Sequence, residues 1–384
     1  MIDSNAAITA TDLFTQLVLK PGPTLHEVVG PALEGYVMGH WGFSEAGYHT
    51  LVAFLCANAM AGFVTVTALV LTLAERKVAA FFQNRKGPNR VGPWGLLQPI
   101  ADVLKLLQKE DTVPRAADRP VFLLAPFVGM IATYMVLAII PFDKDLAVTD
   151  LNIGVLYITA VSGLGVLSIL MAGWSSANKY SMLGGLRSAA QIVSYELSPA
   201  LVVLSVVLFS GTLSVQGIVE RQGQGWNLWA MGPMGVVGLL IYLVAGTAEI
   251  NRAPFDLPEA ESELVAGYHT EYSGMRFSMF QLAEFMNMFI IAALTATLFL
   301  GGWQPLMSGG KNLLAFIPGL ALVPGYLYFF AKTTVVMFVI MWFRWTFPRV
   351  RVDQLMKLEW KILLPLSFVN LIAVALWAAA GFGK

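Results

Sequence analysis

Residues 51–74 read LVAFLCANAMAGFVTVTALVLTLA and contain no charged side chain. A helix needs about 20 apolar residues to cross the hydrocarbon core of a bilayer, where only helices and closed barrels satisfy their backbone groups. The rest of the 384-residue chain has the same character: 57% of its residues are hydrophobic, 12% are charged and the mean hydropathy is +0.68. Soluble domains carry roughly 25% charged residues. The chain is therefore predicted to be an integral membrane protein built of helices.

The predicted fold is an all-α membrane domain with eight transmembrane helices. They are expected at about 51–74, 121–141, 153–174, 188–210, 233–250, 277–301, 314–343 and 362–381. The seventh stretch is long for one crossing, so it should tilt, bend or break near Pro318 and Pro324.

Lysine and arginine residues predict the orientation of these helices. The segments 75–120, 175–187, 251–276 and 344–361 hold 18 basic residues together, against 5 in all the segments of the other side. Basic residues gather on the cytoplasmic side. We therefore expect these four loops in the cytoplasm and both termini on the far side, which is the periplasm for a bacterial plasma membrane.

The chain divides into an N-terminal extension, residues 1–45, and a membrane domain, residues 46–384. The extension has no assignable role. In the first cytoplasmic loop, residues 94–109 place apolar and polar side chains on opposite faces, which predicts an amphipathic helix lying in the membrane interface. Such a helix can anchor the loop to anionic lipid or form the doorway for a lipid-like substrate.

Several kinds of site are excluded by composition. The chain has one cysteine, Cys56, and four histidines without metal-ligand spacing, so it cannot hold an iron–sulfur cluster alone and no metal site is expected. No predicted span contains a histidine for haem, and the chain has a net charge of zero and no basic tail that would suggest nucleic-acid binding. Redox chemistry would have to belong to a partner protein.

Carboxylates gather at the stretch PFDLPEAESELVAGYHTEY, residues 254–272, and inside the spans. Asp256 and Glu259 fit a helix-capping pattern around Pro258. Capping leaves the other acids unexplained. The candidates for a hydrated proton path are Glu196, Glu249, Asp256, Glu259, Glu261, Glu263, Glu271, Glu284 and Lys332. Charged groups inside a membrane pair with one another or line water, so a structural Glu–Lys pair is the alternative.

Five stretches carry a resemblance to a known family. They are AERKVAAFFQNRKGPNRVGPWGLLQPIADVLKLLQKE, LRSAAQIVSYE, AEINRAPFDLPEAESELVAGYHTEYSGMRF, LAEFMN and FPRVRVDQLMKLEWK. Together they closely resemble the H-subunit family of proton-translocating NADH–quinone oxidoreductase (respiratory complex I), in order from about residue 51 to 370. The chain departs from the family in its N-terminal extension and in Pro258, where some relatives have alanine.

The resemblance implies a function. A member of this family forms much of the quinone access cavity, and its buried carboxylates couple quinone reduction to proton translocation, with loop 251–276 between the two. The motif match places Glu75, Arg76, Arg85, Asp102, Phe277 and Arg344 along the quinone cavity. Quinone would be the substrate, no cofactor would be bound by this chain alone, and FMN and iron–sulfur clusters would lie in partner subunits. The implied partners are peripheral-arm quinone-site subunits, membrane-arm proton-channel subunits and the lipid bilayer.

Three other functions remain open at this point. The chain could be a stand-alone proton or cation transporter, although such a protein would not need a long basic loop with an amphipathic helix. It could be a passive anchor, which leaves the embedded acids without a reason. It could also be the equivalent subunit of a membrane-bound hydrogenase or a non-NADH dehydrogenase.

Overall fold

The computed structural model describes residues 45–144, 146–258, 261–308, 311–312 and 323–381. The predicted all-α membrane fold is confirmed for this part of the chain, where the only strands are the two-residue pair β1 Met307–Ser308 and β2 Lys311–Asn312. Seven of its helical segments are long and apolar enough to cross a membrane. Of the predicted extension, residues 1–44 lie outside the described residues.

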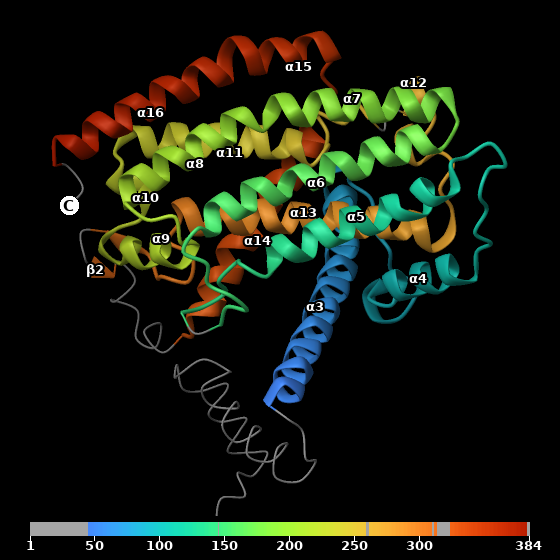
Figure 1. Cartoon of the computed structure of the whole chain (residues 1–384), viewed down its shortest axis with the longest axis horizontal. Helices are drawn as coiled ribbons and strands as arrows, with labels where there is room; N and C mark the ends of the chain where they lie inside the picture. Colours follow the sequence, from blue (N-terminus) through green and yellow to red (C-terminus); the bar gives the residue numbers. More distant parts are fainter. Residues whose placement is uncertain (1–44, 145, 259–260, 309–310, 313–322, 382–384) are drawn as a thin grey trace, which may run out of the picture.

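The seven segments are single helices or helices joined across a break (Figure 1). They are α3 (Glu45–Phe82), α5 (Arg119–Leu137), α6 (Gly154–Ser175), α7 (Lys179–Tyr195) with α8 (Leu197–Ser210), α13 (Gly274–Phe299), α14 (Gly325–Thr346), and α15 (Val352–Leu358) continued through the π-helical turn Glu359–Leu363 into α16 (Leu364–Ala379). A further apolar helix, α11 (Pro233–Glu249), has 17 residues.

Shorter elements lie between these helices. They are the 3-10 turn Pro93–Gly95, α4 (Gln98–Gln108), α9 (Val215–Arg221), the 3-10 turn Gln222–Gln224, α10 (Asn227–Ala230), α12 (Glu261–Leu264) and the 3-10 turn Gly267–His269.

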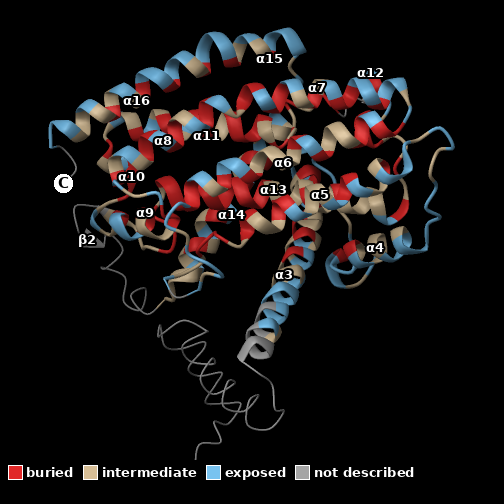
Figure 2. Ribbon diagram, in the orientation of Figure 1, coloured by how far each residue is buried: buried red, intermediate tan, exposed pale blue. Residues whose placement is uncertain are grey.

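Helix α13 forms the centre of the bundle, and the surrounding helices pack against it. Every residue from Met288 to Phe299 is buried, because α3, α5, α11 and α14 all pack against this helix. Around it, α5 packs on α6, α6 on α7, and α8 on α16 (Figure 1). Figure 2 shows α13 mostly buried, whereas the outward sides of α3 and of α15–α16 are exposed. An apolar side that no other helix covers is what lipid-facing helices present.

Several predicted boundaries differ from the structure. Helix α3 runs to Phe82, so Glu75 and Arg76 lie on the helix and not in a loop. Helix α7 begins at Lys179, which makes most of the predicted loop 175–187 helical. The amphipathic stretch 94–109 becomes helical only at Gln98, because Gly92, Trp94 and Gly95 have positive φ and cannot continue a helix. The break expected near Pro324 is confirmed, since α14 begins at Gly325, whereas Pro318 lies outside the described residues.

Candidate functional site: a cavity with three carboxylates and an arginine bridge

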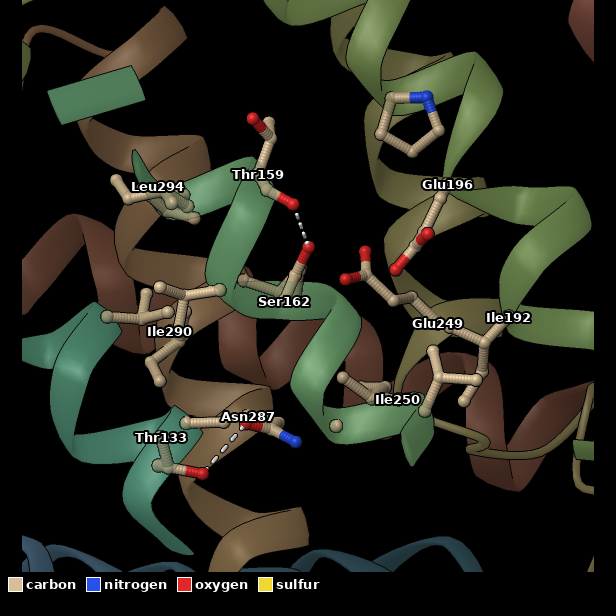
Figure 3. A pocket seen from close by; sticks show the side chains of 18 of the residues that line it. Thr133, Thr159, Ser162, Ile192, Glu196, Glu249, Ile250, Asn287, Ile290 and Leu294 are labelled. Atoms are coloured by element: carbon tan, nitrogen blue, oxygen red, sulfur yellow. Dashed lines mark hydrogen bonds between the residues drawn. The ribbon is translucent and has the colours of Figure 1, made fainter. Parts of the chain in front are cut away.

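A cavity of about 460 Å³ lies among α5, α6, α7–α8, α11 and α13. Three of the predicted proton-path acids line it: Glu196 from the α7–α8 break, Glu249 from the last turn of α11, and Glu284 from α13. Figure 3 shows the side chains of Glu196 and Glu249 extending toward each other from their two helices. Acids that are far apart in the sequence therefore face one cavity among the membrane helices.

Glu196 lies at a break that its own sequence explains. Residue 199 is proline, which has no N–H group, so the carbonyl of Tyr195 loses its normal helical donor. Helix α7 ends at Tyr195 and α8 begins at Leu197, with Glu196 between them. Its Oε1 atom is buried and has no hydrogen-bond partner among the described residues. A carboxylate oxygen in this position is available to water in the cavity.

Polar side chains from α5, α6 and α13 complete the cavity wall. Thr133 donates a hydrogen bond of 3.3 Å to Oδ1 of Asn287, as Figure 3 shows. Thr159 and Ser162 line the cavity from α6, and Figure 3 shows them across from the carboxylates of Glu196 and Glu249. Sequence reasoning missed these residues, because single hydroxyl and amide groups are common in apolar helices and carry no distinctive spacing.

A buried arginine joins the cavity to a second cluster of charges. Arg252, only 4% exposed, places Nε 2.8 Å from Oε1 of Glu284 and Nη1 2.8 Å from both carboxylate oxygens of Glu75. Arg344 also donates to Oε1 of Glu75. The space between Glu75, Arg252 and Arg344 has no room for a water molecule. The four residues form one continuous network of charges, in which only Arg344 reaches toward the surface, with 32% of its side chain exposed.

The sequence-based prediction did not name Arg252, the residue that joins the two clusters of charges. The signal was present, because this basic residue stands between Glu249 and Asp256 in an acid-rich stretch. The network brings two predicted quinone-cavity residues, Glu75 and Arg344, into contact with the predicted proton-path acid Glu284. Loop 251–276 supplies the bridge between them.

The other predicted quinone-cavity residues are not gathered in one pocket. Arg76 pairs with Asp102 at 2.6 Å and so ties α3 to α4. Arg85 is exposed and donates to Gln83 at 2.6 Å. The ring of Phe277 contacts that of His269, with centroids 5.3 Å apart. Burial lowers the pKa of His269 to about 4, so this imidazole is neutral near pH 7.

The acids of loop 251–276 have separate partners. Asp256 accepts a hydrogen bond of 3.1 Å from Arg349, and Glu263 one of 2.6 Å from Arg187. Glu271 accepts from Asn178, which caps the start of α7. Glu261 is the first residue of α12, whereas Glu259 lies outside the described residues. Asp256 also pairs with Arg349 at 3.1 Å, and its predicted capping role stays a prediction, because residues 259–260 before α12 lie outside the described residues.

Lys332 lies away from the acids of the cavity. Its Nζ donates to the carbonyls of Leu300, Gly302 and Gln304 after the end of α13, and lies 4.4 Å from the centre of the Trp226 ring. Its partners are thus backbone carbonyls and not a carboxylate of a neighbouring helix. A cation at a helix C-terminus is favoured by the helix dipole.

Comparison with known proteins shows the family of this chain. The family model described as NADH dehydrogenase matches residues 55–375, which run from α3 into α16. A protein of Bacteroides thetaiotaomicron, named as the H subunit of NADH-quinone oxidoreductase, is 51% identical over 317 residues, covering 83% of this chain and 88% of that protein. Proteins with the same name from Anoxybacillus flavithermus and Geobacillus kaustophilus are 51% identical over 316 residues and 48% identical over 341 residues. These matches cover 82% and 88% of this chain, and 89% and 98% of the two relatives.

The chain belongs to the family of H subunits of NADH-quinone oxidoreductase. The resemblance found in its sequence motifs is thereby confirmed, and so is its nature as a multi-pass membrane protein. The residues matched by the family include the three cavity carboxylates, the Arg252 bridge and the loop between them. The unmatched residues at the N-terminus include the extension for which the sequence predicted no role.

Proposed function

We propose that this chain, as a membrane subunit of NADH–quinone oxidoreductase (complex I), couples quinone reduction to proton translocation through the carboxylates of its central cavity. The observation that carries the proposal is the bridge at Arg252, which contacts Glu75 on one side and Glu284 on the other. The chain itself would bind no redox cofactor. Electrons would reach the quinone from FMN and iron–sulfur clusters in partner subunits.

The proton path would run through the central cavity. Its volume of about 460 Å³ is ample for several water molecules, each of which takes about 30 Å³ in the liquid. Glu284, Glu249 and Glu196 line the space, together with hydroxyl and amide groups that can orient water. Acids that are buried near one another can hold and release protons near neutral pH, which is the property a proton path needs. The loop acids Asp256, Glu259, Glu261, Glu263 and Glu271 would form its cytoplasmic approach.

The quinone would be reduced on the side of Glu75 and Arg344. Addition of two electrons and two protons to a quinone changes the charge of the groups that supply the protons. In a low-dielectric interior such a change acts strongly on neighbouring ions. The guanidinium group of Arg252 would then interact more strongly with one of its two partners, Glu75 or Glu284, and less strongly with the other. The proton affinity of Glu284 would change as a result.

The remaining quinone-cavity candidates fit a wall shared with other subunits. Arg76, Arg85, Asp102 and Phe277 lie on α3, the following loop, α4 and α13, and the first three are near the surface of this chain. Peripheral-arm subunits would complete the cavity on this side and bring the electron carriers close to the quinone. Membrane-arm subunits would receive the protons from the central cavity.

In the membrane we propose eight crossings, with α11 as the eighth. Its 17 residues span about 25 Å, close to the thickness of the hydrocarbon core. Helix α4 would lie in the cytoplasmic interface, since it leaves Ile100, Leu104 and Leu107 exposed. Both termini would be periplasmic in a bacterial plasma membrane.

Cysteine labelling tests this orientation. Lys86→Cys and Arg221→Cys, each in a Cys56→Ser background, place one exposed thiol on each predicted side. An impermeant reagent should label position 86 only from the cytoplasm and position 221 only from the periplasm. Labelling of both positions from one side would contradict the proposed topology.

Glu249→Gln tests the coupling function. The complex should be purified with this chain, assayed for flavin and iron–sulfur content, and reconstituted into liposomes. We expect full cofactor content and normal NADH oxidation with an artificial acceptor, but strongly reduced quinone-linked turnover and proton pumping. Normal pumping in this variant would contradict the proposed path, and a preparation that carries nickel–iron centres would favour the hydrogenase alternative.

A further inference from the structure

A further buried carboxyl group of the membrane helices belongs neither to the central cavity nor to the network around Arg252. Glu359 is fully buried, whereas Trp360 and Ile362 on the same turn are 50% and 55% exposed. Its Oε1 atom accepts a hydrogen bond from the hydroxyl group of Ser198, and its Oε2 atom has no partner among the described residues. This carboxyl group has no role in the proposed function.

The turn that carries Glu359 is shaped to turn this side chain inward. Residues 359–363 form a π-helical turn, in which the N–H of Leu364 bonds to the carbonyl of Glu359. Pro365 follows and cannot donate a backbone hydrogen bond, which disturbs the regular helical register just before it. Single π-turns inside helices are frequent at functional sites.

The contact with Ser198 is made on the face of α8 that points away from the cavity. Ser198 lies two residues after Glu196, which corresponds to about 200° around a helix axis. Glu196 lines the cavity, whereas Ser198 does not. Tyr195, on the other side of Glu196, donates a hydrogen bond of 3.0 Å to the carbonyl of Leu355. The residues that flank Glu196 are therefore both tied to the helix that contains Glu359.

These ties matter because the helix is weakened next to Glu196. Proline at position 199 removes one helical hydrogen bond, the one to the carbonyl of Tyr195, whereas Glu196 keeps helical backbone angles and its N–H still bonds to the carbonyl of Ile192. The direction in which Glu196 points is then held in part by side-chain contacts on either side of it. Ser198 and Tyr195 supply such contacts, and Ser198 reaches its partner only through the Glu359 carboxyl group.

We propose that Glu359 is a positioning residue for the proton path: through Ser198 it holds in place the proline-weakened helical turn that points Glu196 into the cavity. The inference rests on the proposed function of Glu196. It assigns a role to a residue that touches neither the cavity nor the predicted quinone site.

The carboxyl group acts in its neutral form. The groups that face it are the hydroxyls of Tyr195 from α7 and Ser198 from α8, and no basic side chain of the described residues lies within ion-pair distance. The neighbouring Lys357 and Lys361 are exposed on the other side of the helix. A buried anion without a counter-charge is strongly disfavoured, so the neutral carboxyl group, which can still bond to Ser198, is the form that fits this position.

Three variants test the proposal in the intact complex reconstituted into liposomes. Glu359→Leu and Ser198→Ala each remove the contact, from opposite sides, whereas Glu359→Gln keeps a neutral hydrogen-bonding group of the same length. We expect the first two to lower the proton-to-electron ratio or quinone-linked turnover by roughly threefold or more, the effect of about one hydrogen bond. Glu359→Gln should pump normally at neutral pH, because its side chain can still bond to Ser198 without a charge.

The double variant separates positioning from general destabilisation. Glu359→Leu combined with Ser198→Ala should be no worse than either single change, because both remove one contact. NADH oxidation with an artificial acceptor should stay unchanged throughout. If Glu359→Leu does not assemble, Ser198→Ala and Glu359→Gln carry the same test.

Two outcomes overturn the inference. Normal pumping in both Ser198→Ala and Glu359→Leu would show that the contact positions nothing. A Glu359→Gln variant as impaired as the leucine variant would show that Glu359 itself transfers protons. Glu196→Gln, measured in parallel, separates this inference from the proposed function. If Glu196→Gln pumps normally, the proposed function is contradicted. If Glu196→Gln is impaired while Ser198→Ala is normal, only the role of Glu359 is contradicted.

Discussion

Arg252 and Glu284 form an ion pair of 2.8 Å between a loop and the central helix of the bundle, and the same guanidinium group holds both carboxylate oxygens of Glu75. Its planar shape, with donors on several edges, allows one side chain to serve two carboxylates at once. The loop that carries Arg252 thus supplies the link between Glu75, a predicted quinone-cavity residue, and Glu284 in the central cavity. Any movement of this loop would change the environment of both acids.

Replacement of Arg252 should be severe. Arg252→Leu leaves Glu75 and Glu284 facing each other without their shared cation, a change that typically destabilises by about 3–5 kcal/mol. We expect poor assembly or a lower temperature of thermal inactivation, with Arg252→Lys intermediate because an ammonium group cannot hold both acids in the same geometry.

Arg187→Leu provides the matched control for this experiment. Arg187 also pairs with a glutamate, but the side chain of that partner, Glu263, is 55% exposed. Water therefore compensates for the lost partner, and its effect on stability should be far smaller. Equal stability of the Arg252 and Arg187 variants would contradict the bridging role.

The pair of Glu263 and Arg187 predicts a pH-dependent contact at the loop. The hydrogen bond and then the charge of Arg187 hold the pKa of Glu263 below its ordinary value of 4.5. A lowered carboxyl pKa stabilises the folded state above 4.5, and the contribution disappears as the pH falls through the lowered value. At neutral pH Glu263 is thus a carboxylate paired with Arg187, in the loop proposed as the approach to the proton path. Because Glu263→Gln removes this charge, it should reduce quinone-linked activity at neutral pH. Electron transfer to an artificial acceptor should not change, and neutral-pH rates equal to wild type would withdraw Glu263 from the coupling path.

His269 predicts a pH dependence of stability in a different range. Its folded pKa of about 4 lies below its ordinary value of 6.5, so the unfolded chain binds more protons between these values. Stability should consequently fall as the pH is lowered from 6.5 toward 4. Thermal inactivation of the purified complex at several pH values measures this slope. His269→Leu should flatten it, and an unchanged slope would assign the dependence to other groups.

Lys332 should prove structural. Its ammonium group contacts three carbonyls after the end of α13, and Lys332→Met would leave them without this donor. We expect reduced thermal stability of the complex, with proton pumping per assembled complex close to wild type. Lys332→Arg should retain part of the stability. A stable Lys332→Met complex that oxidises NADH but does not pump would return this residue to the proton path.

The sequence predicted the elements that depend on local composition. Long uncharged stretches located the helices, and acids inside them, such as Glu196 and Glu284, stood out because charges are rare in lipid-facing segments. The pairing of these groups could not be predicted, because it depends on tertiary packing. The sequence therefore did not reveal the carbonyl partners of Lys332. It also did not distinguish Arg252 from the other residues of its loop.

The burial of Glu359 could not be predicted from the sequence either. Two lysines flank it in the sequence, which made the stretch 344–361 look like a solvated loop. The structure makes Val352–Ala379 one long apolar segment and buries this carboxyl group against α8. A buried position within a mixed sequence cannot be recognised without the helix that covers it.

The most direct test of the account is the proton-to-electron ratio of the reconstituted complex with Glu196→Gln. The glutamine keeps the size and polarity of the side chain but cannot carry a proton, and Glu196→Asp provides the matched control that keeps the acid. The account predicts an assembled complex with normal electron transfer to an artificial acceptor, strongly reduced proton pumping in Glu196→Gln, and a milder defect in Glu196→Asp. A Glu196→Gln complex that pumps protons with the wild-type ratio would contradict the claim that the cavity carboxylates form the proton path.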